Sequence, residues 1–348
     1  MSHKRTTIID LAKACSVSKT TISFAFNNPD RIGKETYDLI MQKAKELDYI
    51  PNPAGRNFSL KKKQTIGFLL PQNFEGTFSN PYITQVIQGI GNICNQKDFT
   101  LTLIPPSKEN MNESVYKVSV DGLIAMGINV EMELVELLNR MQIPLVTIDG
   151  HPSKNMPSIN IDDKKASYDL MIEVLASNHR NIAIIKLKEN EFEKSTKYNS
   201  TTQIRLLGFE RALNEYNIKL DDSNISIYES ECNIESASNI AKKIIEENIN
   251  PTCIVCMSDI LAIGCISYLK QNSYNIPQDI SIVGFDDIQS STIVSPNLTT
   301  IEQASIEKGQ IAAKTLFDLI ENKELTTVHK VLEHKLIIRD SLKKIVIG

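Results

Sequence analysis

The chain has 348 residues, of which 41% are hydrophobic and 23% are charged, and this length leaves room for two or three globular domains. No apolar run approaches the ~20 residues that cross a bilayer, and the N-terminus MSHKRTTIID lacks the apolar segment of a signal peptide. We therefore expect a cytoplasmic protein without a membrane partner.

Charge is divided unevenly along the chain. Residues 1–63 hold nine lysines and three arginines against six acids, a formal charge of +6, which leaves −10 on the remainder. A basic head on an acidic body is typical of a nucleic-acid-binding module joined to another domain, although a solvated basic tail would have the same charge. The patterned, non-repetitive sequence of this head favours the module.

The head is predicted to begin with two short helices joined by a tight turn. Thr7 and Asp10 have the spacing of a capping box at the start of the first helix. The turn covers Cys15–Val17, and Ser18 is a good N-cap for a second helix that runs through Phe26. Two helices joined in this way are the first part of a helix-turn-helix unit.

A third, longer helix is expected from Lys34 to Leu47, followed by prolines that end it. We place the helix-turn-helix DNA-binding domain at 1–49 and a hinge helix with its linker at 50–64. Apolar residues recur at helical spacing in the third helix, which predicts that they face a small core: Tyr37, Ile40, Met41, Ala44 and Leu47.

The second helix has two different faces. Ile22, Ala25 and Phe26 form a stripe that can pack on the first helix, and Thr20 and Phe24 lie on the opposite side. Small hydroxyls near a helix N-terminus suit phosphate contacts and an aromatic ring suits thymine methyl groups, although a plain solvent-facing helix has the same pattern. The residues of the head expected to contact DNA are Thr7, Ser18, Lys19, Thr20, Thr21, Ser23, Phe24 and Asn27.

From Ile66 onward, short apolar runs such as TIGFLLP, DGLIAM, NIAIIKL and ISIVGFDD alternate with helical stretches. This repetition predicts parallel sheets with helices on both faces. The strands outnumber those of one sheet of ~6, so two doubly wound lobes are expected, with ligands outside the carboxyl ends of the strands. The expected helices are Tyr82–Gln96, Glu131–Arg140, Lys164–Ser177, Ile204–Tyr216, Ile234–Glu247 and Ile260–Gln271.

Motifs for catalysis, cofactors and metals are missing from the sequence. Cys253 and Cys256 form a C-x-x-C, but a strand would point the two thiols to opposite faces. The five histidines have no metal-ligand spacing, and neither a nucleophile elbow nor a phosphate-binding loop is present. We therefore expect a non-enzymatic protein without cofactor or metal.

The segment from TIIDLAKACSVSKTTISFAFNN through LDYIPNPAGR to TIGFLLP resembles the LacI/GalR family of bacterial transcription regulators. The resemblance continues through SNPY, IPLVTIDG, INIDD, RLLGFERAL, MSDILAIG, QDISIVGFDD and LTTIEQ, which covers nearly the whole chain. It implies a helix-turn-helix head, a hinge helix that orders on DNA, and a two-lobed core at 65–348 like a periplasmic binding protein. The lobes would be interleaved, the first at about 65–161 plus 291–322 and the second at about 162–290 plus 323–348.

Several residues depart from the family pattern. Cys15 and Ser16 replace the usual Ala-Gly of the turn, and Phe24 replaces an arginine that binds guanine, so the operator is expected to differ there. In the hinge, Gly55 lowers helix propensity by about 1 kcal/mol relative to alanine, and Phe58 replaces the leucine that wedges into the minor groove. The hinge residues that the resemblance places on DNA are Asn52, Arg56 and Phe58.

The resemblance also implies an effector site between the lobes. Arg205 in RLLGF matches the family's arginine, whose guanidinium can hold two oxygens, and Asp286 in GFDD matches its aspartate. Asp149, Asp162 and Tyr82 are further candidates. The alternative roles are a surface ion pair or a loop cap for Arg205 and Asp286, turn caps for Asp149 and Asp162, and core packing for Tyr82.

The function expected from these features is a homodimeric transcription regulator, most simply a repressor of carbohydrate-use genes. Its heads would bind a pseudo-palindromic operator in double-stranded DNA, and a small effector, expected to be a sugar, would control that binding allosterically. Two alternatives remain open at this point. A ligand-binding protein without a DNA role would fail to retard DNA in a gel, and an α/β enzyme would need a nucleophile and base that the sequence does not reveal.

Overall fold

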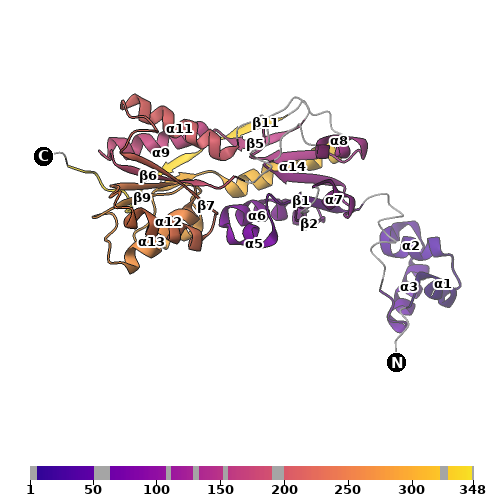
Figure 1. The fold of residues 1–348 in the computed structure, drawn as a ribbon. Helices are drawn as coiled ribbons and strands as arrows, with labels where there is room; N and C mark the ends of the chain where they lie inside the picture. Colours follow the sequence, from indigo (N-terminus) through magenta and orange to yellow (C-terminus); the bar gives the residue numbers. More distant parts are fainter. Residues whose placement is uncertain are drawn as a thin grey trace. The chain divides into compact units, whose positions relative to one another are not determined.

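The computed structural model describes residues 6–50, 63–106, 111–127, 133–151, 156–189, 200–321 and 328–346. The chain divides into two compact units, Met1–Gln64 and Thr65–Gly348, called here the head and the core, and each is described by itself (Figure 1). Within the described ranges, the helices lack the combination of length and apolar character that crossing a bilayer requires.

The head contains the three predicted helices. They pack around a small apolar cluster in which Ile22 and Ala25 of the second helix meet Leu11 of the first, as the apolar stripe predicts. Met41 and Leu47 were expected in this core, but both are 37% exposed, because Ile40 and Ala44 form the inward face of the third helix. The elements are α1 (Ile8–Cys15), α2 (Lys19–Asn27), the short 3-10 helix η1 (Pro29–Arg31) and α3 (Lys34–Glu46).

The first lobe of the core is a parallel six-stranded sheet with the strand order β11-β5-β4-β3-β1-β2. Its strands are short and mostly buried on both faces, as expected for parallel strands covered by helices. Their bounds are β1 (Thr65–Leu69), β2 (Thr100–Ile104), β3 (Gly122–Met126), β4 (Leu145–Ile148), β5 (Ser158–Ile161) and β11 (His329–Leu332).

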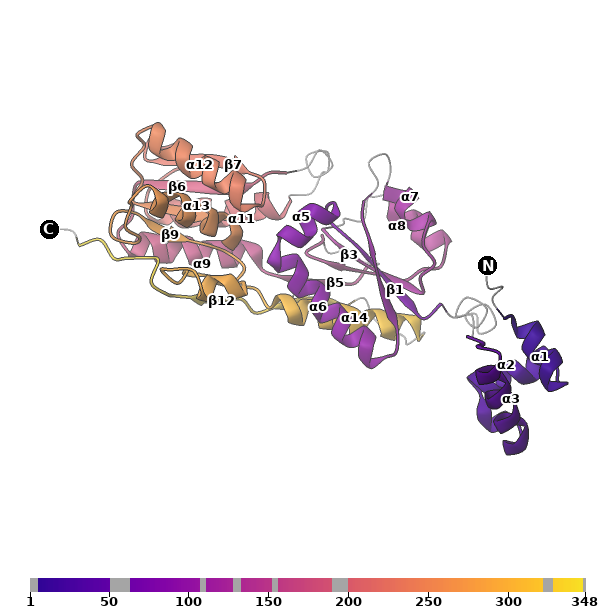
Figure 2. The same cartoon turned by 90° about the horizontal axis from the view of Figure 1, so that it is seen from below.

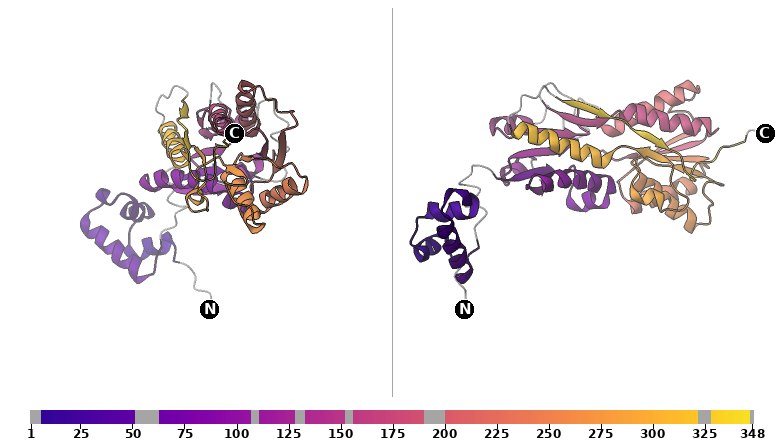
Figure 3. Two further views of the ribbon diagram at one scale, coloured as in Figure 1. Left: turned by 90° about the vertical axis from the view of Figure 1, so that its left-hand side faces the viewer. Right: turned by 180° about the vertical axis from the view of Figure 1, so that it is seen from behind.

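Helices cover both faces of this sheet. Ile124 of β3 packs with the helices α6 and α14, and Leu123 beside it packs with α7 and α8 on the other face, because successive strand residues alternate sides. Figure 3 shows α14 running alongside α6, with which it makes close contact. The helices are α5 (Phe74–Ser79), α6 (Pro81–Gln96), α7 (Met111–Tyr116), α8 (Glu133–Arg140) and α14 (Ser305–Ile320).

The second lobe is a parallel four-stranded sheet with the order β7-β6-β8-β9. Cys253 and Cys256 of β8 are free thiols that belong to different apolar clusters, which confirms that the C-x-x-C thiols point to opposite faces. The helices α9 and α11 cover one face and α12 and α13 the other, as Figure 1 shows, and Figure 2 gives the same lobe seen from below. The elements are β6 (Ile182–Leu187), β7 (Ile225–Ser230), β8 (Cys253–Cys256), β9 (Ser281–Val283), α9 (Asp163–Ala176), α11 (Thr201–Glu215), α12 (Ile234–Glu246) and α13 (Asp259–Gln271).

The lobes are joined where the chain crosses between them, and two expected boundaries need correction there. The segment 323–348 was expected in the second lobe, but its strand β11 pairs with β5 in the first because it extends that sheet in register. The end of the segment lies in the second lobe as expected, since the carbonyl of Ser341 accepts from the amide of Ile282 there. The segment 291–299 was expected in the first lobe, but Leu298 packs in a core cluster of the second. The antiparallel pair β10 (Thr300–Glu302) and β12 (Lys335–Ile337) forms the crossing itself.

Both sheets have the strand order of doubly wound folds, in which the chain winds outward in both directions from an early strand. Ligands in such sheets bind outside the carboxyl ends of the strands, where the order reverses. The segments that follow the carboxyl ends of β1, β4, β8 and β9 are therefore the places to look for an effector site.

Candidate functional site

Capping interactions hold the first two helices of the head and their turn. The Thr7 hydroxyl accepts from the Asp10 amide at 3.4 Å and the Thr7 amide donates to Asp10 Oδ2 at 3.0 Å, so the predicted capping box is present. Ser16 ends α1 with φ 55° and ψ 36°, a left-handed conformation that costs a non-glycine residue roughly 1 kcal/mol. The backbone strain of the turn therefore lies at Ser16, one of the two residues that depart from the family pattern there.

The second helix keeps its polar residues at the surface. Ser18 is the N-cap, and its Oγ lies 3.1 Å from the Thr21 amide and 2.9 Å from Thr21 Oγ1. Asn27 Nδ2 donates to Ser23 Oγ at 3.1 Å. These side chains thus have local partners as well as access to solvent, and their contact with DNA stays a prediction.

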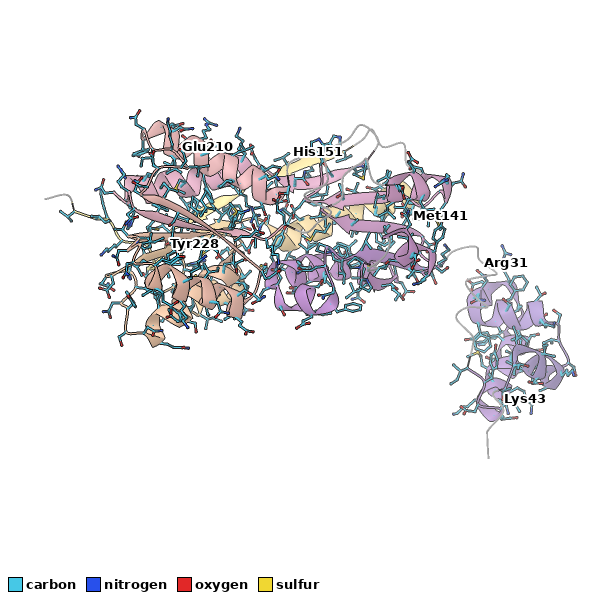
Figure 4. The ribbon with its side chains drawn as sticks, viewed as in Figure 1. Arg31, Lys43, Met141, His151, Glu210 and Tyr228 are labelled. Atoms are coloured by element: carbon cyan, nitrogen blue, oxygen red, sulfur yellow. The ribbon has the colours of Figure 1, made fainter. Side chains whose placement is uncertain are left out.

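Lys19 and Thr20 are exposed at the start of α2, and the ring of Phe24 is half-buried one turn later. The guanidinium of Arg31 lies 5.7 Å from the centroid of the Phe24 ring, a cation–π contact that brings a positive charge to the side of the helix with Thr20 and Phe24. Figure 4 labels Arg31 and Lys43 at the surface of the head. The hinge residues Asn52, Arg56 and Phe58 lie outside the described residues.

In the first lobe, the structure brings together Tyr82 and Asp149 with a residue that the sequence did not single out, Lys308. Tyr82 lies in the first turn of α6, capped by Asn80, and its hydroxyl donates to the carboxylate of Asp149, which directly follows β4. Lys308 Nζ on α14 lies 2.7 Å from Asp149 Oδ1. Burial and the nearby Asp149 charge raise the pKa of Tyr82 far above its usual value, so it remains a donor.

In the second lobe, Arg205 is 4% exposed and forms a buried ion pair instead of a surface one. Its Nε donates to Asp163 Oδ1 at 2.8 Å and its Nη1 to the carbonyl of Met257, just after β8, at 2.7 Å. The guanidinium lies 3.7 Å from the centroid of the Phe285 ring. Asp163, which sequence reasoning missed, therefore fixes the guanidinium together with a backbone oxygen and an aromatic face.

Asp286 follows β9 and is 5% exposed. Its Oδ2 accepts from Ser258 Oγ at 2.9 Å, and its Oδ1 accepts from Gln303 Nε2 at 2.5 Å. Burial and the charge of Asp259 raise the pKa of Asp286 to about 7, while Arg205, Ser258 and Gln303 oppose that rise. This carboxyl group is therefore poised to change its protonation near neutral pH.

Asp259 is a second buried carboxylate beside Asp286, and sequence reasoning missed it as well. It accepts from Ser291 Oγ at 2.6 Å, Thr300 Oγ1 at 2.5 Å and the Ile288 amide at 3.0 Å. Burial raises the pKa of Asp259 to about 6, against the effect of these donors. Thr300 belongs to β10, so its bond to Asp259 links the crossing segment to the second lobe.

Asp162 has a different role from its neighbour. Its side chain is exposed and caps α9 by accepting from the Lys165 amide at 2.9 Å, the capping alternative for a loop aspartate. Asp163, one residue later, is the partner of Arg205. A motif such as INIDD cannot distinguish the two aspartates, because a one-residue shift at a helix start turns a side chain by about 100°.

The polar residues form one cluster between the sheets, and its groups are of the kinds that hydrogen-bond a molecule with several hydroxyl groups. It offers carboxylate acceptors, the guanidinium and ammonium donors, and the aromatic faces of Tyr82 and Phe285. Within the described parts of the chain, no group of three or more His, Cys, Asp or Glu side chains has the geometry to hold a metal ion. The groups of the cluster that the structure does show are hydrogen-bond donors and acceptors.

Comparison with known proteins agrees with this two-part plan. The model of bacterial regulatory proteins of the lacI family matches residues 7–52, and that of a periplasmic binding protein-like domain matches residues 173–342. The chain is 30% identical to the HTH-type transcriptional regulator RegA of Clostridium saccharobutylicum, over 97% of this chain and 99% of RegA. It is 31% identical to the HTH-type transcriptional repressor PurR of Vibrio vulnificus, over 97% and 99% of the two chains.

Solved structures share the fold. A LacI family regulator from Enterococcus faecium with bound ribose has a TM-score of 0.71 and 26% identity, covering 81% of this chain and all of that one. The lac repressor dimer bound to operator and the anti-inducer ONPF has a TM-score of 0.79 and 21% identity, covering 98% of this chain and all of that one. The chain therefore belongs to the LacI family of bacterial transcription regulators, and its relatives are named as regulators and repressors, not as enzymes.

Proposed function

We propose that this regulator is a homodimeric repressor that binds a pseudo-palindromic operator through its heads and releases or tightens its hold when a sugar binds between the core lobes. The observation that carries the proposal is the coexistence of a basic helix-turn-helix head with a buried cluster of hydrogen-bonding groups in the core. The lac repressor dimer bound to operator, which shares the fold, supports the dimeric arrangement.

The proposed DNA surface of the head is α2 with its cap and the start of α1. Exposed Lys19 and Thr20 would meet phosphates and base edges in the major groove, and Phe24 would contact thymine methyl groups. The other residues of the head proposed to contact DNA are Thr7, Ser18, Thr21, Ser23 and Asn27. The hinge residues Asn52, Arg56 and Phe58 belong to the proposal on the strength of the family match alone, with Phe58 as the wedge in the minor groove.

The proposed effector site comprises Arg205, Asp286, Tyr82 and Asp149, with Asp162 as a peripheral member. Three carboxylates of the cluster other than Asp286, which are Asp149, Asp163 and Asp259, outnumber its two cations, Arg205 and Lys308. This excess holds without Asp286, whose raised pKa leaves it partly protonated near neutral pH. An anionic ligand would add to this excess of buried negative charge at a high electrostatic cost. The charge balance therefore favours an uncharged polyol such as a sugar, and the ribose bound by the Enterococcus faecium regulator is in keeping with that class.

Control of DNA binding would follow from a difference in effector affinity between two arrangements of the lobes. Since coupling between two sites is reciprocal, operator binding must change effector affinity by the same factor by which the effector changes operator affinity. A carbohydrate effector in turn makes carbohydrate-use genes the proposed targets.

Calorimetry with a panel of neutral sugars, sugar phosphates and purines tests the effector proposal. Heat from at least one neutral sugar, with saturation at one site per chain, is the expected result. No heat from any sugar, together with heat from a purine or a phosphorylated metabolite, would show that the effector class is wrong. A gel shift against a genomic fragment library tests the DNA role separately, and failure to enrich any fragment would contradict it.

A further inference from the structure

Lys308 is a fully buried cation of the core, with 0% of its surface exposed. An ammonium group has three N–H donors, and each of them has an acceptor here. Nζ lies 2.7 Å from Asp149 Oδ1, 2.9 Å from the Tyr82 hydroxyl oxygen and 2.9 Å from Gln303 Oε1. A buried charge is tolerated only when it is paired and hydrogen-bonded, so this saturation explains how the lysine can lie there.

The three acceptors come from different parts of the fold. Tyr82 lies at the start of α6 and Asp149 at the end of β4, both in the first lobe, and Gln303 lies in the crossing segment between β10 and α14. Gln303 is itself buried and donates through Nε2 to Asp286 in the second lobe at 2.5 Å. A continuous path therefore runs from the first lobe through Lys308 and Gln303 to Asp286.

The backbone that carries Lys308 is held tightly. A Cβ added to Gly309 would lie 2.3 Å from the carbonyl oxygen of Val86, and one added to Gly89 would lie 2.1 Å from that of Ile306. The helices α6 and α14 thus touch backbone to backbone, one residue away from Lys308. The backbone next to Lys308 therefore lies directly against α6, the helix that carries Tyr82.

A second connection between the lobes is weaker. Asn80 Nδ2 donates to Cys232 Sγ at 3.6 Å, and that thiol lies 3.6 Å from Ser258 Oγ. Sulfur is a weak acceptor and a weak donor, and neither bond involves a charged group. The path through Lys308 contains charge-assisted bonds, which are roughly twice as strong as neutral ones.

We propose that Lys308 is a positioning residue for the effector site, which orients Tyr82 and Asp149 directly and Asp286 through Gln303. The effector role of this site rests on the proposed function, whereas the hydrogen-bonded path through Lys308 does not depend on it. Without the ammonium, Asp149 and Tyr82 would lose their common partner. Gln303 would lose the donor to its Oε1, which orients its amide toward Asp286. Both halves of the site would then loosen together although Asp286 does not touch Lys308.

Hydrogen exchange of the full-length protein, followed by mass spectrometry, tests the path without any ligand. In Lys308→Met, we expect exchange to rise by about tenfold, or about 1.4 kcal/mol, at the protected amides of Asp149 in the first lobe and Asp259 and Asp286 in the second. Lys314→Met, an exposed position on the same helix, is the matched control and should match the wild type. A rise confined to α14 and α6 would overturn the proposal, since it would show a packing role alone.

Gln303→Leu separates the two halves of the path. It removes the link to Asp286 and leaves the bonds from Lys308 to Tyr82 and Asp149, so exchange should rise at Asp259 and Asp286 but not at Asp149. This variant also decides the question if Lys308→Met does not fold, because unchanged exchange at Asp259 and Asp286 would then overturn the proposal.

Effector affinity adds a readout that separates this inference from the proposed function. With a sugar that binds the wild type, Lys308→Met should weaken binding by about tenfold or more, and Lys314→Met should not weaken it. If no sugar binds the wild type but the exchange pattern is found, the proposed effector class falls and the positioning role stands. If a sugar binds both variants equally, the positioning role falls and the effector class stands.

Discussion

Polar side chains of the head and of the core differ in their exposure and in how far away in the sequence their hydrogen-bond partners lie. On α2 of the head, Lys19 and Thr20 are exposed, and Ser18 and Thr21 bond to neighbours within one turn. In the core, Arg205 and Asp286 are nearly inaccessible and bond to partners far away in the sequence. Exposed groups with local partners can exchange them for a new partner at little cost in free energy. In a buried network, the loss of one group weakens the hydrogen bonds of the others.

The largest expected effect tests the buried side of this comparison. Arg205→Met leaves Asp163 buried without its ion-pair partner and removes the contact with Phe285, so we expect a loss of about 3–5 kcal/mol of stability. Effector binding should weaken by roughly 100-fold for the same reason. Urea unfolding and calorimetry measure the two effects.

Arg211→Met on the same helix is the matched control for Arg205→Met. Arg211 is exposed, so its replacement should leave unfolding and effector binding close to the wild type. Arg205→Lys keeps a positive charge but loses the fork of donors, and an intermediate loss is expected. If Arg205→Met were as stable as Arg211→Met, the buried network would not be the sensitive region that we describe.

A smaller effect is expected on the exposed side. Phe24→Ala should weaken operator binding by about 1–3 kcal/mol and relax the preference for one base pair in each half-site, because a contact with a thymine methyl group is lost. The free energy of unfolding should change little, since the ring is only half-buried. Fluorescence anisotropy with the selected operator and its single-base variants measures both affinity and preference.

Two further variants serve as comparisons for Phe24→Ala, and these are Lys19→Ala and Met41→Ala. Lys19→Ala should weaken binding to all DNA sequences alike and reduce the dependence on salt by about one phosphate contact. Met41→Ala, an exposed apolar position on α3 outside the proposed surface, should not alter affinity. Equal losses for Phe24→Ala and Met41→Ala would mean that the surface has been placed wrongly.

The dependence of stability on pH sharpens the comparison further. The pKa of Asp286 is raised to about 7 and that of Asp259 to about 6, mainly by burial, whereas an unfolded aspartate titrates near ~3.9. The native state thus binds more protons than the unfolded chain between these values. The free energy of unfolding contributed by these groups is therefore largest below about pH 4 and falls as pH rises to about 7.

Asp286→Asn isolates this contribution. Its free energy of unfolding should fall less steeply than that of the wild type, by at most about 1.4 kcal/mol per pH unit for one titrating group. Urea unfolding of both proteins at about pH 5, 6 and 7 gives the difference directly. Parallel curves would show that Asp286 is ionised throughout, against the protonation that its buried position predicts.

The smallest expected effect concerns the turn of the head. Ser16 has φ 55°, so Ser16→Gly should stabilise the head by about 1 kcal/mol, because glycine takes this conformation without steric cost. Slower exchange at the amides of α1 and α2 in the full-length protein measures the gain. Ser23→Gly, in the middle of α2, is the contrasting change and should speed that exchange, because glycine lowers helix propensity.

The head and the core also differ in how much of their structure could be predicted from the sequence. Local signals were enough for the head, since the capping box at Thr7, the N-cap at Ser18 and the apolar stripe with Ile22 are patterns within one helix turn. They failed for Met41 and Leu47, because Ile40 and Ala44 form the inward face of α3. The lobes and most helices of the core also followed from the alternation of strands and helices.

The candidate effector site was only partly predictable. Arg205 and Asp286 came from a family motif, but Lys308 and Asp259 belong to no local pattern that the sequence displays. From the sequence, Lys308 would be predicted to face solvent on an amphipathic helix. Its burial follows from the packing of α14 on α6. Likewise, β11 was misplaced because the pairing of a C-terminal strand depends on tertiary contacts.

The central claim is that an exposed helix of the head reads DNA under the control of a buried polar network in the core. Its most direct test is the operator affinity of full-length wild type and Arg205→Met, titrated with the sugar panel on DNA selected by the wild type. We predict that one sugar changes the operator affinity of the wild type several-fold and leaves that of Arg205→Met unchanged. An equal response in both proteins, or a failure of the wild type to select any DNA, would contradict the account.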